Sequence, residues 1–200
     1  MNRPLFASAI LAATLASPLV ALAADPAGNF AVRGIGSQLC SALNDQVAKK
    51  DPNLAATLES WVSGYVTSMN RLQPDTFDAS PILQNGALAQ MVVNVCQRTP
   101  KSAVETVTFD IFKALSPARV HAASTNVTAT SDGKTIVLRR ETLIALQTAL
   151  TRQGVGKEAA TGLFTPATAT ALKAFQAKAK LTQTGLPDPA TTIALLAPGR

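Results

Sequence analysis

An eleven-residue segment occurs twice near the end of the chain. Residues 162–172 read GLFTPATATAL and residues 185–195 read GLPDPATTIAL, with seven identical positions. Each copy starts with a Gly that permits a tight turn. A helix-capping side chain (Thr165 or Asp188) follows, and then a Pro, which is favoured at the first position of a helix. Both copies therefore predict a turn that leads directly into a helix.

Helical periodicity upstream of this repeat predicts a third helix in the same region. Leu143, Leu146 and Leu150 are spaced so that they lie on one face of a helix. Two copies of a turn–helix unit are too few for a solenoid, which needs about three repeats or more. We therefore expect residues 138–198 to form a compact three-helix bundle.

The first 23 residues have the layout of a secretory signal. One basic residue, Arg3, precedes an apolar stretch over residues 5–22, and residues 21–23 (ALA) form a small-x-small cleavage site. The alternative is a transmembrane anchor, against which the Pro and the many Ala of the stretch argue. We expect residues 1–23 to be removed and the mature chain, with no further membrane span, to lie in the periplasm or cell envelope.

Export determines how the two cysteines of the chain are interpreted. In an oxidising compartment two cysteines of one domain usually pair. A bond between Cys40 and Cys96 closes a long loop and contributes about 4 kcal/mol of stability in a loop-entropy model. The alternative is two buried free thiols.

Four apolar stripes at the helical period predict four helices in residues 30–118. The clearest stripe covers residues 54–69 and is interrupted by Gly64, which indicates the close approach of another helix or a partner. The remaining stripes cover residues 35–47, 88–96 and 104–115. Cys40 and Cys96 fall on the apolar faces of the first and third helices. The prediction is an all-α chain whose N-terminal domain is a disulfide-held four-helix unit.

The net positive charge of the mature chain is concentrated in its second half. Residues 24–119 contain eight basic and eight acidic residues, and residues 120–200 contain nine and four. Between the halves, residues 119–137 are small and polar without periodicity, which predicts a linker. The basic half would attract polyanions of the cell envelope, and export excludes nucleic acid as a partner. An ordinary solvated surface is the alternative.

A pattern of Leu, Gly, Thr and aromatic positions extends over residues 143–196. Its members are Leu146, Gln147, Leu150, Gly154, Gly162, Phe164, Pro166, Ala167, Thr168, Ala174, Phe175, Gln176, Leu181, Thr184, Gly185, Thr191 and Leu195. This pattern resembles the peptidoglycan-binding three-helix domain found on many bacterial wall enzymes. The chain departs from the family pattern at Val155, Gly156, Thr161 and Thr165, in or beside the loop next to the expected glycan groove.

The resemblance implies that the C-terminal domain binds peptidoglycan through its glycan or its peptide stem. The candidate ligand-binding residues are Gly162, Phe164, Thr165, Thr168, Phe175, Gln176, Arg139 and Arg140.

A second and looser pattern lies within residues 35–115. Its members are Cys40, the segment 61–65 (WVSGY), Asn70, the segment 94–97 (NVCQ) and Pro100. This pattern resembles the HdeA-type periplasmic helical domain, whose best-known members are acid-stress chaperones. The resemblance implies that residues 30–118 engage protein clients and release apolar surface when carboxylates are protonated. A small helical immunity protein is an alternative.

The sequence offers few parts for catalysis. The chain has one histidine, His121, which falls in the predicted linker, and two cysteines, so a zinc site or a catalytic triad is not expected. Asp75 and Asp78 are too close in the sequence to predict a glycosidase pair across a cleft. We therefore expect a non-catalytic protein without metal or cofactor that docks on peptidoglycan. A wall-assembly adaptor is the alternative, and a wall hydrolase is less favoured.

Overall fold

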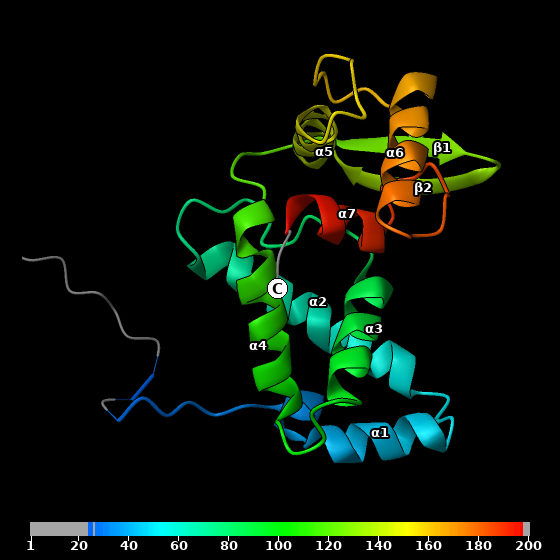
Figure 1. The fold of residues 1–200 in the computed structure, drawn as a ribbon. Helices are drawn as coiled ribbons and strands as arrows, with labels where there is room; N and C mark the ends of the chain where they lie inside the picture. The colour runs from blue at the N-terminus through cyan, green and yellow to red at the C-terminus, as the bar shows by residue number, and fades with distance from the viewer. Residues whose placement is uncertain (1–23, 26, 198–200) are drawn as a thin grey trace, which may run out of the picture. The chain divides into compact units, whose positions relative to one another are not determined.

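The computed structural model describes residues 24–25 and 27–197, so the signal sequence predicted for residues 1–23 lies outside the described residues. The chain divides into a unit that ends at Ala31 and a compact unit that begins at Val32 (Figure 1). In the first unit, Asp25 Oδ1 accepts hydrogen bonds from the N–H groups of Ala27 and Asn29.

Residues 32–197 form α-helices, one β-hairpin and two short 3-10 helices (Figure 1). The α-helices are α1 (Cys40–Ala48), α2 (Leu54–Leu72), α3 (Asn85–Cys96), α4 (Val104–Leu115), α5 (Arg140–Arg152), α6 (Pro166–Lys178) and α7 (Pro189–Leu196). The other elements are η1 (Gly34–Ser37), η2 (Ser116–Ala118), β1 (Asn126–Ser131) and β2 (Lys134–Arg139). None of the helices in the described residues combines the length and the apolar character that crossing a bilayer requires.

Helices α1 to α4 enclose the first of two clusters of buried apolar side chains. The predicted disulfide is confirmed: it joins Cys40, the first residue of α1, to Cys96, the last residue of α3, and both residues are fully buried. The phenol of Tyr65 donates a hydrogen bond to Glu105 Oε1 (3.1 Å). Burial raises the pKa of Tyr65, and the nearby Glu105 carboxylate adds to this effect. The phenol therefore stays protonated and continues to donate at physiological pH.

Trp61 of α2 packs against the short helix η1. Its indole N–H donates to the carbonyl oxygen of Arg33 (3.1 Å), and a Cβ added at Gly36 would overlap the indole ring. Gly36 is therefore required by the close approach of the ring. At Gly64, by contrast, nothing in the described chain lies within 4 Å of an added Cβ, and the residue is exposed. The close approach that we expected at Gly64 is not made by any described residue.

The all-α prediction is wrong over residues 126–139, most of which were assigned to a linker. These residues form an antiparallel hairpin in which Asn126 pairs with Arg139 and Ser131 with Lys134. Asp132 and Gly133 both have positive φ (48° and 72°), as the two-residue turn of a tight hairpin requires. An Asp-Gly pair between stretches rich in Thr and Val is a strong hairpin signal, but the small, polar character of the segment concealed it.

The hairpin and helices α5 to α7 enclose the second apolar cluster. Ala129 of β1 and Leu138 of β2 are both buried in this cluster together with the leucines of α5. The predicted helix starts are confirmed. The side chain of Thr165 accepts the N–H of Thr168 at the start of α6, and that of Asp188 accepts the N–H of Thr191 at the start of α7. The predicted three helices thus carry a two-stranded sheet in addition.

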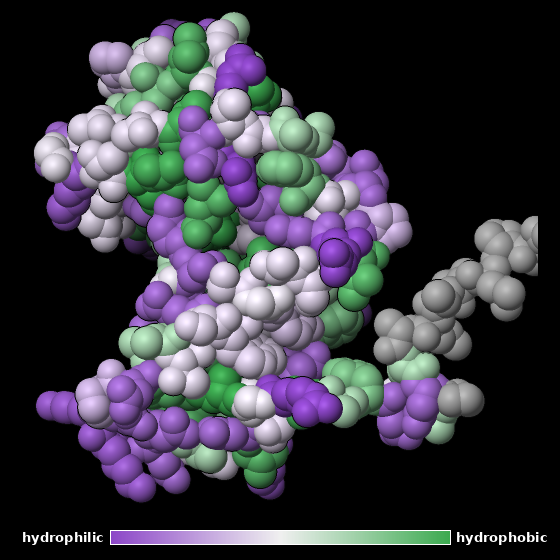
Figure 2. Space-filling model, turned by 180° about the vertical axis from the view of Figure 1, so that it is seen from behind, coloured by the Kyte–Doolittle hydropathy of each residue, from purple (hydrophilic) through white to green (hydrophobic). Residues whose placement is uncertain are grey.

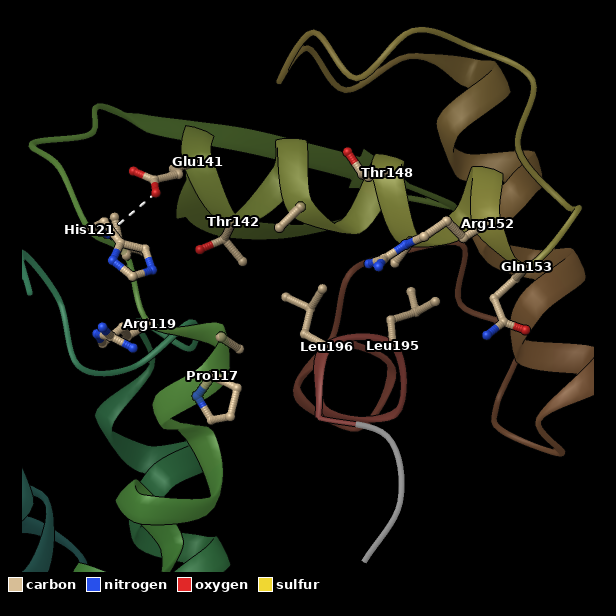
Figure 3. Close-up of a pocket in the computed structure, with 14 residues that line it drawn as sticks. Pro117, Arg119, His121, Glu141, Thr142, Thr148, Arg152, Gln153, Leu195 and Leu196 are labelled. Carbon is tan, nitrogen blue, oxygen red and sulfur yellow. Dashed lines mark hydrogen bonds between the residues drawn. The ribbon is translucent and has the colours of Figure 1, made fainter.

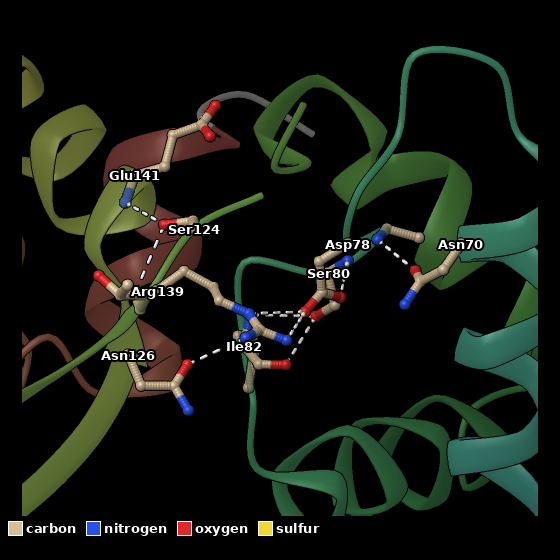
Figure 4. Close-up of polar contacts among 10 residues, drawn as sticks. Asn70, Asp78, Ser80, Ile82, Ser124, Asn126, Arg139 and Glu141 are labelled. Atoms are coloured by element: carbon tan, nitrogen blue, oxygen red, sulfur yellow. Dashed lines mark hydrogen bonds and ion pairs between the residues drawn. The ribbon is translucent and has the colours of Figure 1, made fainter. Parts of the chain in front are cut away.

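A buried ion pair connects the loop between α2 and α3 to the hairpin (Figure 4). Arg139 donates from Nε and Nη2 to Asp78 Oδ2 (3.2 and 3.0 Å), and only 6% of the Asp78 side chain is exposed. The backbone of Asp78 also pairs with that of Val120. Asn70 fixes the loop from the other side, because its Oδ1 accepts the N–H of Ala79 (2.7 Å). The predicted linker, residues 119–137, is also bonded to this loop at both ends: Val120 pairs with Asp78, and the carbonyl of Val137 accepts a hydrogen bond from Gln84 Nε2 (2.6 Å).

Candidate functional site

Two buried glutamines hold the two turns of the internal repeat in place. In the first copy, Gln147 Oε1 accepts the N–H of Gly162 (2.9 Å), and Gln147 Nε2 donates to the carbonyl of Leu163 (2.9 Å) and to Thr168 Oγ1 (3.2 Å). Gln147 lies on α5, one helix before the turn that it binds. Its side-chain amide thus provides the hydrogen-bond partners that the Gly162 N–H and the Leu163 carbonyl lack within the turn.

Gln176 on α6 has the same role for the second copy. Its Oε1 accepts the N–H of Gly185 (2.9 Å), and its Nε2 donates to the carbonyl of Leu186 (3.0 Å) and to Thr191 Oγ1 (2.9 Å). The structural repeat therefore extends beyond the repeated sequence, because each copy also includes a glutamine from the preceding helix. The unequal separation of glutamine and turn in the two copies hid this relation from sequence comparison.

A groove of about 270 Å³ lies between the end of α5, the start of α6 and the loop that connects them. Its apolar surface comes from residues such as Leu150, Val155 and Ala171. At its rim, the Glu158 carboxylate accepts hydrogen bonds from the hydroxyls of Thr165 (2.7 Å) and Thr168 (3.2 Å) at the N-terminus of α6. A carboxylate is stabilised at this position by the helix dipole. The groove therefore combines an apolar floor with a polar rim.

The structure separates six of the eight candidate ligand-binding residues into two groups. Thr168 lines the groove, Thr165 is joined to its rim through Glu158, and Gly162 and Phe164 lie in the turn before α6. Phe175 and Gln176 lie on α6 and are 6% and 0% exposed: Phe175 packs in the second cluster, and Gln176 binds the second turn. No surface of Gln176 is therefore available to a ligand.

The two adjacent arginines do not form a single basic patch. Arg139 is engaged by Asp78 and lies over the ring of Phe77, with 5.2 Å from the guanidinium carbon to the ring centroid. Arg140 donates to the carbonyl of Thr161 (2.6 Å), at the turn before α6. Both guanidinium groups are therefore engaged within the protein, Arg139 by a carboxylate and Arg140 by a backbone carbonyl. Lys173 of α6 pairs with Asp132 at the tip of the hairpin (2.8 Å).

The histidine considered for catalysis and the nearby Ser124 are both used in structural contacts. His121 Nδ1 lies 2.7 Å from Asp75 Oδ2, and Ser124 Oγ accepts the N–H of Glu141 (3.0 Å). No hydrogen bond connects Ser124 to His121 in the described part of the chain. Within residues 24–25 and 27–197, no group of three or more His, Cys, Asp or Glu side chains is placed to hold a metal ion.

Comparison with known families gives one match, in the second half of the chain. Residues 139–195 match the model of a putative peptidoglycan binding domain. No curated protein and no solved structure matches the chain. The match covers α5, α6 and α7, and therefore both glutamine-held turns and the groove. It does not reach residues 30–118, so the fold of that half rests on the structure alone.

Proposed function

We propose that this protein is an exported, non-catalytic component of the cell envelope that docks on peptidoglycan through residues 139–195. The observation that supports this proposal is the family match over these residues, together with the groove that they enclose. The Cys40–Cys96 disulfide supports an oxidising compartment outside the cytosol. In this proposal the groove receives the glycan, with sugar-ring faces against its apolar floor and sugar hydroxyls against its polar rim.

Filling the groove should abolish docking. Ala167 lines the groove and is exposed at the start of α6, whereas Ala177 is exposed on the same helix outside the groove. We expect A167F to reduce co-sedimentation with purified sacculi at least about tenfold, the loss expected from one blocked contact at the centre of an interface. A177F should sediment like the unmodified chain.

The readout is the fraction of protein pelleted at low salt, with thermal unfolding of both variants as a check on folding. Equal loss with A167F and A177F would place the docking surface elsewhere. If the unmodified chain stays in the supernatant, the proposed docking function is wrong.

We further propose that residues 30–118 engage protein clients or partners, as the HdeA-type resemblance implies. Several large apolar side chains of this half are exposed, including Leu72 at the end of α2 (71%) and Phe109 on α4 (45%). On the face that Figure 2 shows, hydrophobic surface occurs as separate patches between polar side chains. Such patches suit weak, reversible contacts with unfolded chains better than one permanent partner.

The activity is tested with an acid-unfolded client, because the HdeA-type resemblance implies that this half releases apolar surface when carboxylates are protonated. We expect the protein to suppress the light scattering of an acid-unfolded client, and L72S/F109S to lose at least half of this effect. L163S is the matched control, because Leu163 is also exposed (61%) but lies in the other half. If the unmodified protein leaves scattering unchanged, a wall-assembly adaptor or an immunity-type protein without chaperone activity becomes the better assignment.

A further inference from the structure

A second pocket, of about 610 Å³, lies on the opposite side of α5 from the groove (Figure 3). One face of α5 forms its roof, the end of α7 forms its floor, and the connection at residues 117–121 closes one side. It shares no lining residue with the groove beside α6. Its volume falls within the range of small-molecule sites, which is about 300–1,000 Å³.

The pocket has an apolar floor and opposite charges at its two ends. Leu195 and Leu196 form the floor, and the guanidinium of Arg152 extends over them (Figure 3). Within the described residues Arg152 has no acidic partner, whereas Arg119 is already bonded to Asp75. Glu141 lies at the other end of the same helix face. Eleven residues of helix separate Glu141 from Arg152, or about 16 Å along the axis.

Thr142, between these two charges, has a hydroxyl without a partner. The residue is 2% exposed, and its Oγ1 is buried without a hydrogen bond in the described structure. Buried polar groups are nearly always hydrogen-bonded, so an orphan of this kind calls for an explanation. Threonine populates two χ1 rotamers in helices, and rotation exchanges its hydroxyl with its methyl group. After this rotation, a ligand in the pocket can provide the hydrogen-bond partner that the Thr142 hydroxyl lacks in the protein.

We propose that this pocket binds a short extended peptide that ends in a free carboxylate. The carboxylate pairs with Arg152, small apolar side chains lie on Leu195 and Leu196, a peptide group bonds Thr142, and an amino group faces Glu141. A span of about 16 Å accommodates about five extended residues at about 3.3 Å each. Building on the docking function proposed above, we assign the peptide as the stem of peptidoglycan, which has alanines, carboxylates and an amino group.

Calorimetric titration of the full chain with a soluble disaccharide–tetrapeptide tests this assignment. R152Q should weaken binding about 10- to 100-fold, as expected for loss of a charge-assisted hydrogen bond, and amidation of the ligand's terminal carboxylate should do the same. R98Q is the control, because Arg98 is exposed on the first half, outside the pocket. Equal affinity of R152Q and R98Q, or of the amidated and free ligands, would overturn the proposal.

Replacing Thr142 distinguishes a role of its hydroxyl in ligand binding from a role in stabilising the fold. T142V should weaken binding about 2- to 10-fold but leave the melting temperature unchanged or higher, since the hydroxyl makes no hydrogen bond in the protein. A lower melting temperature with unchanged affinity contradicts a ligand-binding role for this hydroxyl. Because Arg152 is exposed, R152Q should melt at the same temperature as the unmodified chain.

One further titration tests the source of the peptide, and comparison with sacculus sedimentation separates the pocket proposal from the docking proposal. An all-L alanyl pentapeptide offers the same carboxylate without the wall's stereochemistry, and tighter binding of this peptide than of the muropeptide would overturn the stem assignment. Sacculus sedimentation without muropeptide binding would overturn the pocket while docking through the groove remains. Absence of both would overturn the pocket and the docking function together.

Discussion

Removal of the Cys40–Cys96 disulfide should lower the free energy of unfolding by about 4 kcal/mol, the value expected for closure of a loop of this length. The bond joins the start of α1 to the end of α3, with a sequence separation of 56 residues. Neither cysteine is exposed, so C40A/C96A leaves the surface of the protein unchanged. The loss arises mainly because the unfolded chain gains the freedom that the crosslink had removed.

Urea unfolding of C40A/C96A, followed by the fluorescence of Trp61, measures this effect. Trp61 is the single tryptophan of the chain and packs against the first apolar cluster, so its signal reports on the half that the disulfide holds. Alkylation without a reductant is the accompanying check, since both sulfurs should be unreactive in the native protein. A change of under about 1 kcal/mol would show that packing of α1 and α3 alone fixes this half.

Replacing Gln176 by Met should destabilise the second cluster by about 3 kcal/mol or more. Met has a similar volume but cannot bond the N–H of Gly185 or the carbonyl of Leu186, and each buried group left unpaired costs about 1–3 kcal/mol. Gln183 lies nearby in an exposed loop and makes no side-chain hydrogen bond in the described structure, so Q183M is the matched control.

Calorimetric unfolding and hydrogen exchange at the Gly185 amide measure the effect of Q176M. Exchange at Gly185 should accelerate strongly in Q176M and stay unchanged in Q183M, because the glutamine oxygen is the acceptor of that N–H. If both variants melt at the same temperature, the second turn does not depend on its glutamine. Q147M, which removes the corresponding bonds at Gly162, should show a comparable loss.

Local signals in the sequence were sufficient to predict the helices. Capping residues and prolines placed the starts of α6 and α7, and apolar periodicity located α2 and α4, because these features act within one turn of the chain. The pairing of Cys40 with Cys96 followed from the expectation of export, and the structure confirms it. The all-α prediction failed at the hairpin, where a two-residue turn signal was outweighed by polar composition.

The site was less predictable, because its residues come together only through tertiary contacts. From the sequence, Arg139 is a candidate ligand-binding residue, but in the structure it pairs with Asp78. The two residues are 61 positions apart, and no local pattern in the sequence connects them. Gln176 was recognised as part of a family pattern, although its buried hydrogen bonds make it structural. Thr142 had no signal at all, since an unpaired hydroxyl is a property of the packed structure.

The helix α7 has a side chain in each of the two apolar clusters. Leu195 is buried with the second cluster, whereas Ile193 packs against the first. Together with the Arg139–Asp78 ion pair, this packing restricts the relative motion that a flexible linker would allow between the two halves. If residues 139–195 dock on peptidoglycan as proposed, residues 30–118 would therefore be held at a fixed distance from the wall. A pulling force on one half would be transmitted directly to the other, because no flexible linker between them could extend first.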